Sequence, residues 1–230
     1  FLYGLGIPAF KVGSTDTNNL PYLREIAKKK IPIILSTGMS ALAEVKESVE
    51  AIRSAGNNDI IVLHCTTNYP TPYKEVNLRV LATLEKELDL LVGYSDHTLG
   101  NDVPIAAAAL GAVIIEKHFT LDRTLPGPDH KASLEPNELK EMVHSIRNVE
   151  MALGSSEKKP NRSEIEIAKI ARKSVVAKRR IPKGKIITKE DLVVKRPGNG
   201  IEPKYINDLV GKKATCDIAE DEVCQWGMFE

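Results

Sequence analysis

The stretch "LLVGYSDHTLG", residues 90–100, changes from apolar to polar within a few positions. Residues 90–92 form a short apolar run without alternation, which is typical of a strand buried on both faces of a parallel sheet. Ser95, Asp96 and His97 follow directly. The sequence therefore predicts a buried strand that ends in a hydroxyl, a carboxylate and an imidazole.

Four further apolar runs have the same character and lie at 9–12, 31–35, 60–63 and 113–115. With the run at 90, the starts are separated by 22, 29, 30 and 23 residues. The segments between them carry apolar residues three to four positions apart, which predicts helices. This spacing is the rhythm of consecutive βα units.

Five βα units are consistent with two α/β architectures. One is a doubly wound open sheet, and the other is the later part of a (β/α)₈ TIM barrel. Polar residues follow all five predicted strands, as expected for a barrel, whereas an open sheet concentrates its site at one switch point. We therefore predict about the last five βα units of a TIM barrel, with roughly 75–100 residues of preceding barrel outside this chain.

The composition changes after the predicted barrel segment. We predict the barrel part over 1–153, a linker over 154–173 and a small β-rich domain over 174–230. The stretch 154–164, "GSSEKKPNRSE", is polar, and the last segment holds short β-prone runs punctuated by proline and glycine. A module of this size is below the comfortable limit for a self-sufficient core, so we expect it to dock on another surface.

Charge and composition exclude several classes of partner. Of the 230 residues, 42% are hydrophobic and 27% charged, and the formal net charge is +1, so we expect no nucleic-acid partner. No apolar run reaches roughly 18 residues, so we expect no membrane span. The three cysteines form no CxxC pair, which favours a reducing, cytoplasmic setting.

The first two strand ends indicate an anion site. The first carries Lys11 and Ser14, and the second carries Ser36 within "STG". Hydroxyls and backbone N–H groups at a glycine-containing turn can hold an oxyanion, and a lysine adds compensating charge. Ser36 alone would be compatible with a simple helix cap, but two such ends on adjacent strands favour phosphate.

The fourth and fifth strand ends indicate a metal site. His97 and His118 are 21 residues apart and follow neighbouring strands. Two imidazoles facing one cavity are a frequent way to hold a divalent ion with open coordination positions. Asp96 or Glu116 could add an oxygen ligand or orient an imidazole. His64 is either a further ligand or a core histidine.

Seven motifs resemble, in order and spacing, those of the sialic acid synthase family, which includes N-acetylneuraminate, legionaminate and pseudaminate synthases. They are "FKVGS", "PIILSTGM", "LHCTTNYPTP", "GYSDHTLG", "EKHFT", "GPDH" and "VKRPGNG". The resemblance implies a TIM barrel followed by a SAF, or antifreeze-protein-like, domain. It also implies condensation of phosphoenolpyruvate with an open-chain N-acetylated amino sugar, such as N-acetylmannosamine. The products are a nine-carbon 2-keto acid and phosphate, and the metal is divalent Mn²⁺, Co²⁺ or Mg²⁺.

The resemblance also implies roles for particular residues. His97 and His118 match metal ligands, and Glu116 matches an acidic position beside them. The positions that match phosphoenolpyruvate-binding residues are Lys11, Ser14, Ser36 and Ser95, and those around the sugar are Tyr69 and Asp129. Glu116 and Asp129 are the candidates for orienting hydroxyls or moving protons. Arg196 matches an arginine that the small domain inserts into the partner's barrel in a domain-swapped homodimer. One position departs from the family, because Thr67 stands where asparagine is frequent, and Asn68 follows it.

Two other functions remain open from the residues. A lysine Schiff-base aldolase would use Lys11 or Lys117, both at or near strand ends. A non-catalytic sugar-binding or spore-coat polysaccharide biosynthesis protein would keep the fold and release no phosphate. Borohydride trapping with pyruvate tests the first alternative, and a thermal-shift response to Mn²⁺ separates the second from a metal-dependent enzyme.

Overall fold

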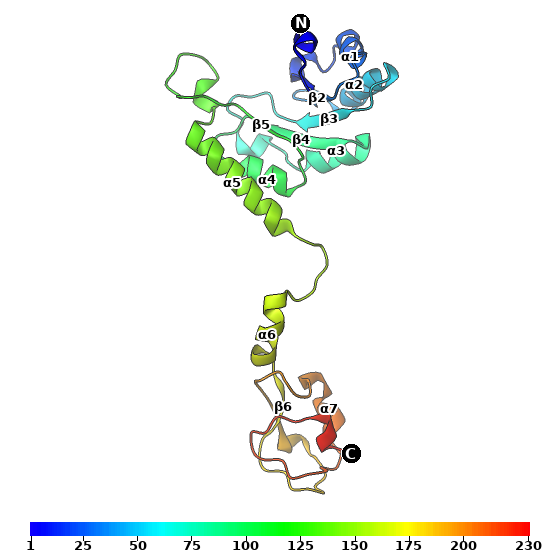
Figure 1. The fold of residues 1–230 in the computed structure, drawn as a ribbon, viewed down its shortest axis with the longest axis vertical. Helices are drawn as coiled ribbons and strands as arrows, with labels where there is room; N and C mark the ends of the chain where they lie inside the picture. The colour runs from blue at the N-terminus through cyan, green and yellow to red at the C-terminus, as the bar shows by residue number, and fades with distance from the viewer. The chain divides into compact units, whose positions relative to one another are not determined.

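The chain folds into two compact units in the computed structural model, which describes residues 1–230. The first unit spans Phe1–Gly154 and the second spans Ser155–Glu230. In Figure 1 the first unit runs from blue to green and the second from yellow to red. No helix in the chain is both long and apolar enough to cross a bilayer.

The first unit is built on one parallel sheet of five strands whose order in space follows their order in the chain. A doubly wound sheet would reverse this order at its switch point. The sequential order is that of a barrel segment, so the prediction of a partial TIM barrel is confirmed. The strands are β1 (Phe10–Val12), β2 (Ile33–Ser36), β3 (Ile60–His64), β4 (Leu91–Asp96) and β5 (Ile115–Lys117).

Helices alternate with the strands, as the sequence spacing predicts. They are α1 (Leu20–Ala27), α2 (Leu42–Ser54), α3 (Val80–Leu88), α4 (Asp102–Ala109) and α5 (Pro136–Leu153). The longest, α5, begins with Pro136, where a missing N–H costs nothing, and Gly154 follows its end with φ 50°. It packs against α4 in Figure 1.

The core of the first unit lies between the sheet and these helices. Ile33, Leu35 and Val62 on the strands are fully buried, as are Leu23 and Ile52 on the helices. Strands that are covered on both faces need apolar side chains at successive positions, which is why these runs do not alternate. Packing of this core fixes the strand ends and therefore the side chains that follow them.

The register of the sheet sorts the residues at these ends into two faces. Ser95 pairs with Glu116, and Asp96 pairs with Lys117. Because successive side chains of a strand point to opposite faces, the two pairs lie on opposite sides of the sheet. One step further along each strand, the same register places His97 beside His118.

The second unit contains a short antiparallel pair of strands and two helices. These elements are α6 (Arg162–Ala171), β6 (Ser174–Ala177), β7 (Leu192–Lys195) and α7 (Ile206–Leu209). Its own apolar cluster includes Val175, Ile181 and Leu209. The predicted linker, 154–173, contains α6, whose start is capped by reciprocal contacts between Asn161 and Glu164.

Candidate active site

A cavity of about 230 Å³ opens at the C-terminal ends of the five strands. Eight residues predicted from the sequence line it, namely Lys11, Ser14, Ser36, Tyr69, Ser95, His97, Glu116 and His118. Three more lining residues were not predicted, namely Gly13, Thr15 and Cys65. Residues from all five strand ends therefore meet in one place, as the fold of a barrel requires.

Lys11 supplies the positive charge of this cavity. Its Nζ donates to Ser36 Oγ at 2.8 Å and to Val12 O at 3.1 Å, and it lies 3.3 Å from Glu116 Oε2. The contact with Glu116 lacks hydrogen-bond geometry, so that buried carboxylate oxygen receives no hydrogen bond. The cavity therefore holds a lysine ammonium between a serine hydroxyl and a carboxylate oxygen.

Hydroxyl groups gather on the side of the cavity near β1. Ser14 Oγ and Thr67 Oγ1 lie 3.3 Å apart. Gly38 makes this approach possible, because a Cβ at this position would stand 2.3 Å from the Ser14 Cβ, and its φ of 42° favours glycine. Ser36, beside Lys11, is 3% exposed and Ser95 is 4% exposed, so both line the cavity as buried residues.

Three aromatic rings form the opposite side of the cavity. The His97 and His118 ring centroids are 5.4 Å apart with their planes at 89°, and the Tyr69 ring lies 4.0 Å from His97. His97 Nδ1 lies 2.7 Å from Thr66 O, which leaves Nε2 without that backbone partner. Burial lowers the pKa of His97, against the opposing effect of this hydrogen bond, so the ring is neutral at pH 7.

The cavity supplies two imidazole ligands for a divalent ion. Two imidazoles that share one ion at about 2.0–2.1 Å have ring centres roughly 5 Å apart, close to the spacing found here. No group of three or more His, Cys, Asp or Glu side chains has metal-binding geometry. An ion held by His97 and His118 would thus keep several positions for water or substrate oxygens, and Glu116 lines the same cavity.

Two of the predicted sugar-binding residues do not line the cavity. Asp129 lies in the loop after β5, where its Oδ2 is 3.8 Å from His118 Nδ1 and its side chain is 62% exposed. Arg196 belongs to the second unit and is exposed directly after β7. Neither Thr67 nor Asn68 lines the cavity, and Asn68 Nδ2 donates to Glu75 Oε2 at 3.5 Å.

Three candidates from the sequence lie on the other face of the sheet. His64 is a core histidine, because it is 8% exposed and its Nε2 lies 2.7 Å from Val76 O. Asp96 is not a metal ligand, because its buried carboxylate pairs with Lys117 at 2.5 Å. The same pair makes Lys117 a poor nucleophile, since its ammonium is buried away from the cavity.

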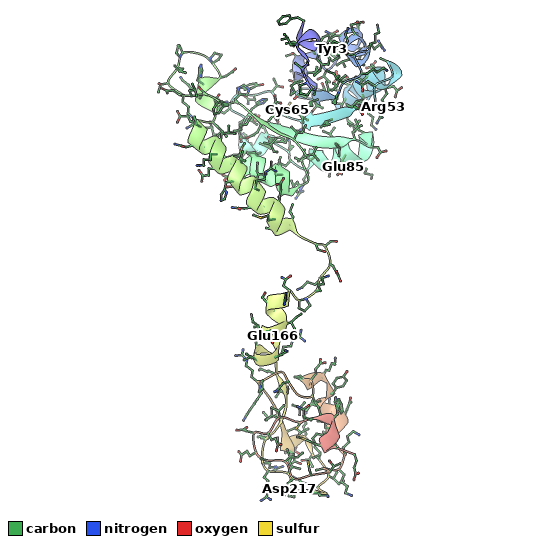
Figure 2. All side chains as sticks on the ribbon, in the orientation of Figure 1. Tyr3, Arg53, Cys65, Glu85, Glu166 and Asp217 are labelled. Carbon is green, nitrogen blue, oxygen red and sulfur yellow. The ribbon has the colours of Figure 1, made fainter.

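Cys65, labelled in Figure 2, is the unpredicted residue of most interest in the cavity floor. It follows β3, and the register that pairs His64 with Tyr94 continues to place Cys65 beside Ser95. Its Sγ accepts from Gly38 N at 3.0 Å, and burial raises the pKa of the thiol. Strand alternation could have found this position, but a neutral thiol is neither a nucleophile nor a metal ligand.

A larger hollow, of about 750 Å³, lies along α3 and is lined mainly by apolar side chains such as Val76, Leu78 and Leu110. It contains no histidine and no carboxylate. The smaller cavity at the strand ends is therefore the candidate active site, because it alone combines a cation, hydroxyls, a carboxylate and two imidazoles.

Comparison with known proteins agrees with this geometry. Residues 1–158 match the NeuB family and residues 172–230 match the SAF domain. An N,N'-diacetyllegionaminic acid synthase of Legionella pneumophila is 45% identical over 234 residues, covering 100% of this chain and 66% of the relative. Human N-acetylneuraminate-9-phosphate synthase is 45% identical over 224 residues, covering 96% of this chain and 62% of the relative.

A solved structure extends the likeness to the fold. The crystal structure of the spore coat polysaccharide biosynthesis protein SpsE from Bacillus subtilis has a TM-score of 0.64 and 36% identity. The match covers 100% of this chain and 69% of that one. The chain spans about two thirds of the length of the curated relatives that it matches.

Proposed function

We propose that this chain, which belongs to the NeuB family, forms part of an enzyme that condenses phosphoenolpyruvate with an open-chain N-acetylated amino sugar. The products would be a nine-carbon sialic-acid-type 2-keto acid and inorganic phosphate. One observation carries the proposal: Lys11 with its hydroxyls and the His97–His118 pair line the same cavity. The relatives named as synthases support the same reaction class.

The residues on the β1 side suit the phosphate and carboxylate of phosphoenolpyruvate. Lys11 Nζ donates to Ser36 Oγ at 2.8 Å, so the ammonium and the hydroxyl are held side by side in the cavity. Ser14 and Ser95 add hydroxyls to the same cavity. Donors that are fixed in advance stabilise the charge that collects on the departing phosphate without reorganisation during the reaction.

The residues on the β4 and β5 side suit the sugar. His97 and His118 would hold a divalent ion, which when bound would draw electron density from the sugar aldehyde. Carbon 3 of phosphoenolpyruvate attacks that aldehyde carbon, carbon 2 then takes up water, and the tetrahedral centre expels phosphate. Glu116, which lines the cavity beside Lys11, would accept a proton from the attacking water. The Tyr69 ring, stacked near His97, would cover the sugar chain.

Phosphate release tests this proposal in the full-length protein. Phosphoenolpyruvate is supplied with Mn²⁺ and a panel of N-acetylated hexoses, and release is expected with N-acetylmannosamine or a related sugar and not without it. Lys11 is the remaining candidate for a Schiff-base aldolase, so borohydride reduction with pyruvate is run in parallel. A trapped adduct on Lys11, with product formed from pyruvate and no phosphate released from phosphoenolpyruvate, would replace the condensing mechanism with the aldolase.

The proposal includes a homodimer in which Arg196 of one copy completes the cavity of the other. Arg196 is exposed after β7, and a guanidinium suits a carboxylate or acyl oxygen. Mixing two inactive variants, Arg196→Ala and His118→Gln, tests it, because a mixed dimer then contains one intact site. Recovery of about a quarter of wild-type activity is expected from statistical mixing, and no recovery would show that each copy uses its own arginine or none.

A further inference from the structure

A buried ion pair lies directly beneath the two imidazoles. The Asp96 and Lys117 side chains are 0% and 1% exposed, and Oδ2 and Nζ are 2.5 Å apart. The sheet register places these residues side by side on β4 and β5. Each immediately precedes one imidazole, His97 on the first strand end and His118 on the second.

Both side chains of the pair are bonded to Thr98, the residue that follows His97. Asp96 Oδ1 accepts from Thr98 N at 3.0 Å, and Asp96 Oδ2 accepts from Thr98 Oγ1 at 3.0 Å. Lys117 Nζ donates to Thr98 O at 2.5 Å. Residue 97 is therefore held between two anchored positions, and both anchors are joined to the strand that carries His118.

His118 depends more heavily on this anchor than His97. Its ring has an ion contact with Asp129 that spans 3.8 Å, which is beyond hydrogen-bond distance, whereas His97 is fixed by its contact with Thr66 O. The strand before His118, β5, has three residues, and Leu134 N donates to His118 O at 2.9 Å just after it. Lys117 is the buried side chain next to this imidazole, and its bonds join the end of β5 to Asp96 and Thr98.

A gain in folding stability does not account for the buried Asp96–Lys117 ion pair. Removing two charges from water is costly, and well-packed apolar residues of similar volume are often as stable or more stable in the same place. The pair makes directional bonds that apolar side chains cannot make, and all of them end at residue 98 or between the two strands. Its effect is therefore expected in the position of the strand ends.

We propose that Asp96 and Lys117 are positioning residues that hold the His97 and His118 imidazoles at the spacing required by one divalent ion. The inference rests on the metal site of the proposed function. Neither side chain touches the ion or the substrate. Both act through the backbone, and their role accounts for a lysine that is buried away from the cavity and cannot serve as a nucleophile.

The test is a pair of apolar replacements in the full-length protein, Asp96→Leu with Lys117→Met. Co²⁺ is titrated into the apoprotein without substrate, and both its affinity and its visible absorption spectrum are recorded. Loss of residues that orient metal ligands typically lowers affinity 10- to 100-fold, and we expect a fall of about that size together with an altered spectrum, while the protein stays folded. The matched control is Lys46→Met with Glu87→Leu, which removes a surface ion pair of 2.6 Å and should leave both readouts unchanged.

The outcomes separate this inference from the proposed function. Wild-type affinity and an unaltered spectrum in the apolar double variant would overturn the positioning role and leave the metal site intact. A wild-type protein that binds no Co²⁺, or binds it equally well as His97→Gln, would overturn the metal site itself. If this double variant and a second one, Asp96→Asn with Lys117→Met, both fail to fold, the pair is required for the fold and the positioning role is again refuted.

Discussion

Replacing Lys11 by methionine removes the positive charge of the cavity and keeps the length of the side chain. In the structure, Lys11 Nζ donates to Ser36 Oγ at 2.8 Å and lies 3.3 Å from Glu116 Oε2. The Lys11 and Glu116 side chains are 34% and 40% exposed, so their ion contact is screened by solvent. The substitution therefore acts mainly on a ligand that binds between these groups.

The two expected effects differ in size. An ion pair with this exposure contributes about 0–1 kcal/mol to stability, so the variant should unfold within a few degrees of the wild type. A hydrogen bond from an ammonium to a phosphate or carboxylate contributes about 1.5–3 kcal/mol. Its loss lowers kcat/KM for phosphoenolpyruvate roughly 10- to 150-fold, since each 1.36 kcal/mol is a factor of ten.

The assay measures phosphate release at saturating sugar over a range of phosphoenolpyruvate concentrations, with thermal unfolding followed on the same samples. Lys46→Met is the control, because Lys46 is also a paired lysine but lies on α2, outside the cavity. It should leave kcat/KM unchanged. A Lys11→Met enzyme with wild-type kcat/KM, or one whose activity falls only in proportion to its unfolding, would refute the assignment of Lys11 to the anion.

Three other predictions concern the metal, the sugar and the second unit. Mn²⁺ should raise the unfolding temperature of the wild-type protein and not that of His118→Gln, as measured by thermal shift, because an ion bound only by the folded state stabilises it. Tyr69→Ala should raise KM for the sugar about tenfold in the phosphate assay while Tyr69→Phe changes it little, because the ring rather than the hydroxyl stacks near His97. Asp191→Ala should destabilise the second unit by about 2 kcal/mol or more, or roughly 8–16 °C by calorimetry, because the buried carboxylate accepts from Arg179, Lys185 and Thr188. Burial alone would raise the pKa of Asp191, but these bonds hold the pKa below its unfolded value of 3.8. The stabilisation by Asp191 is therefore present above pH 3.8 and is lost as the pH falls from there through the folded-state pKa. The Asp191→Ala variant lacks this stabilisation at every pH.

Much of the fold could be predicted from the sequence, because strands covered on both faces leave uninterrupted apolar runs. The runs that start at 31, 60 and 90 overlap β2, β3 and β4, and the sequential order of the sheet agrees with polar residues at every strand end. The strand near 113 begins later than its apolar run, at Ile115, and β4 continues through Ser95 and Asp96. Strand boundaries depend on hydrogen bonds to a neighbouring strand, which local composition does not encode.

The candidate site was harder to assign residue by residue. The roles and approximate positions of His97, His118 and Lys11 could be predicted, because imidazole and ammonium side chains at the ends of buried strands indicate a binding site. The face of the sheet on which Asp96 and Lys117 lie could not be predicted from the sequence. One step along a strand reverses the direction of a side chain, and the register is known only from the sheet.

The central claim is that the imidazoles of residues 97 and 118 bind one divalent ion beside the anion-binding lysine. Anomalous scattering from crystals of the full-length protein with Mn²⁺ and phosphoenolpyruvate tests it directly. A single manganese peak about 2.0–2.3 Å from one ring nitrogen of each histidine, with the phosphate next to Lys11, is the predicted result. A peak bound elsewhere, or the two rings turned away from a common centre, would contradict the account.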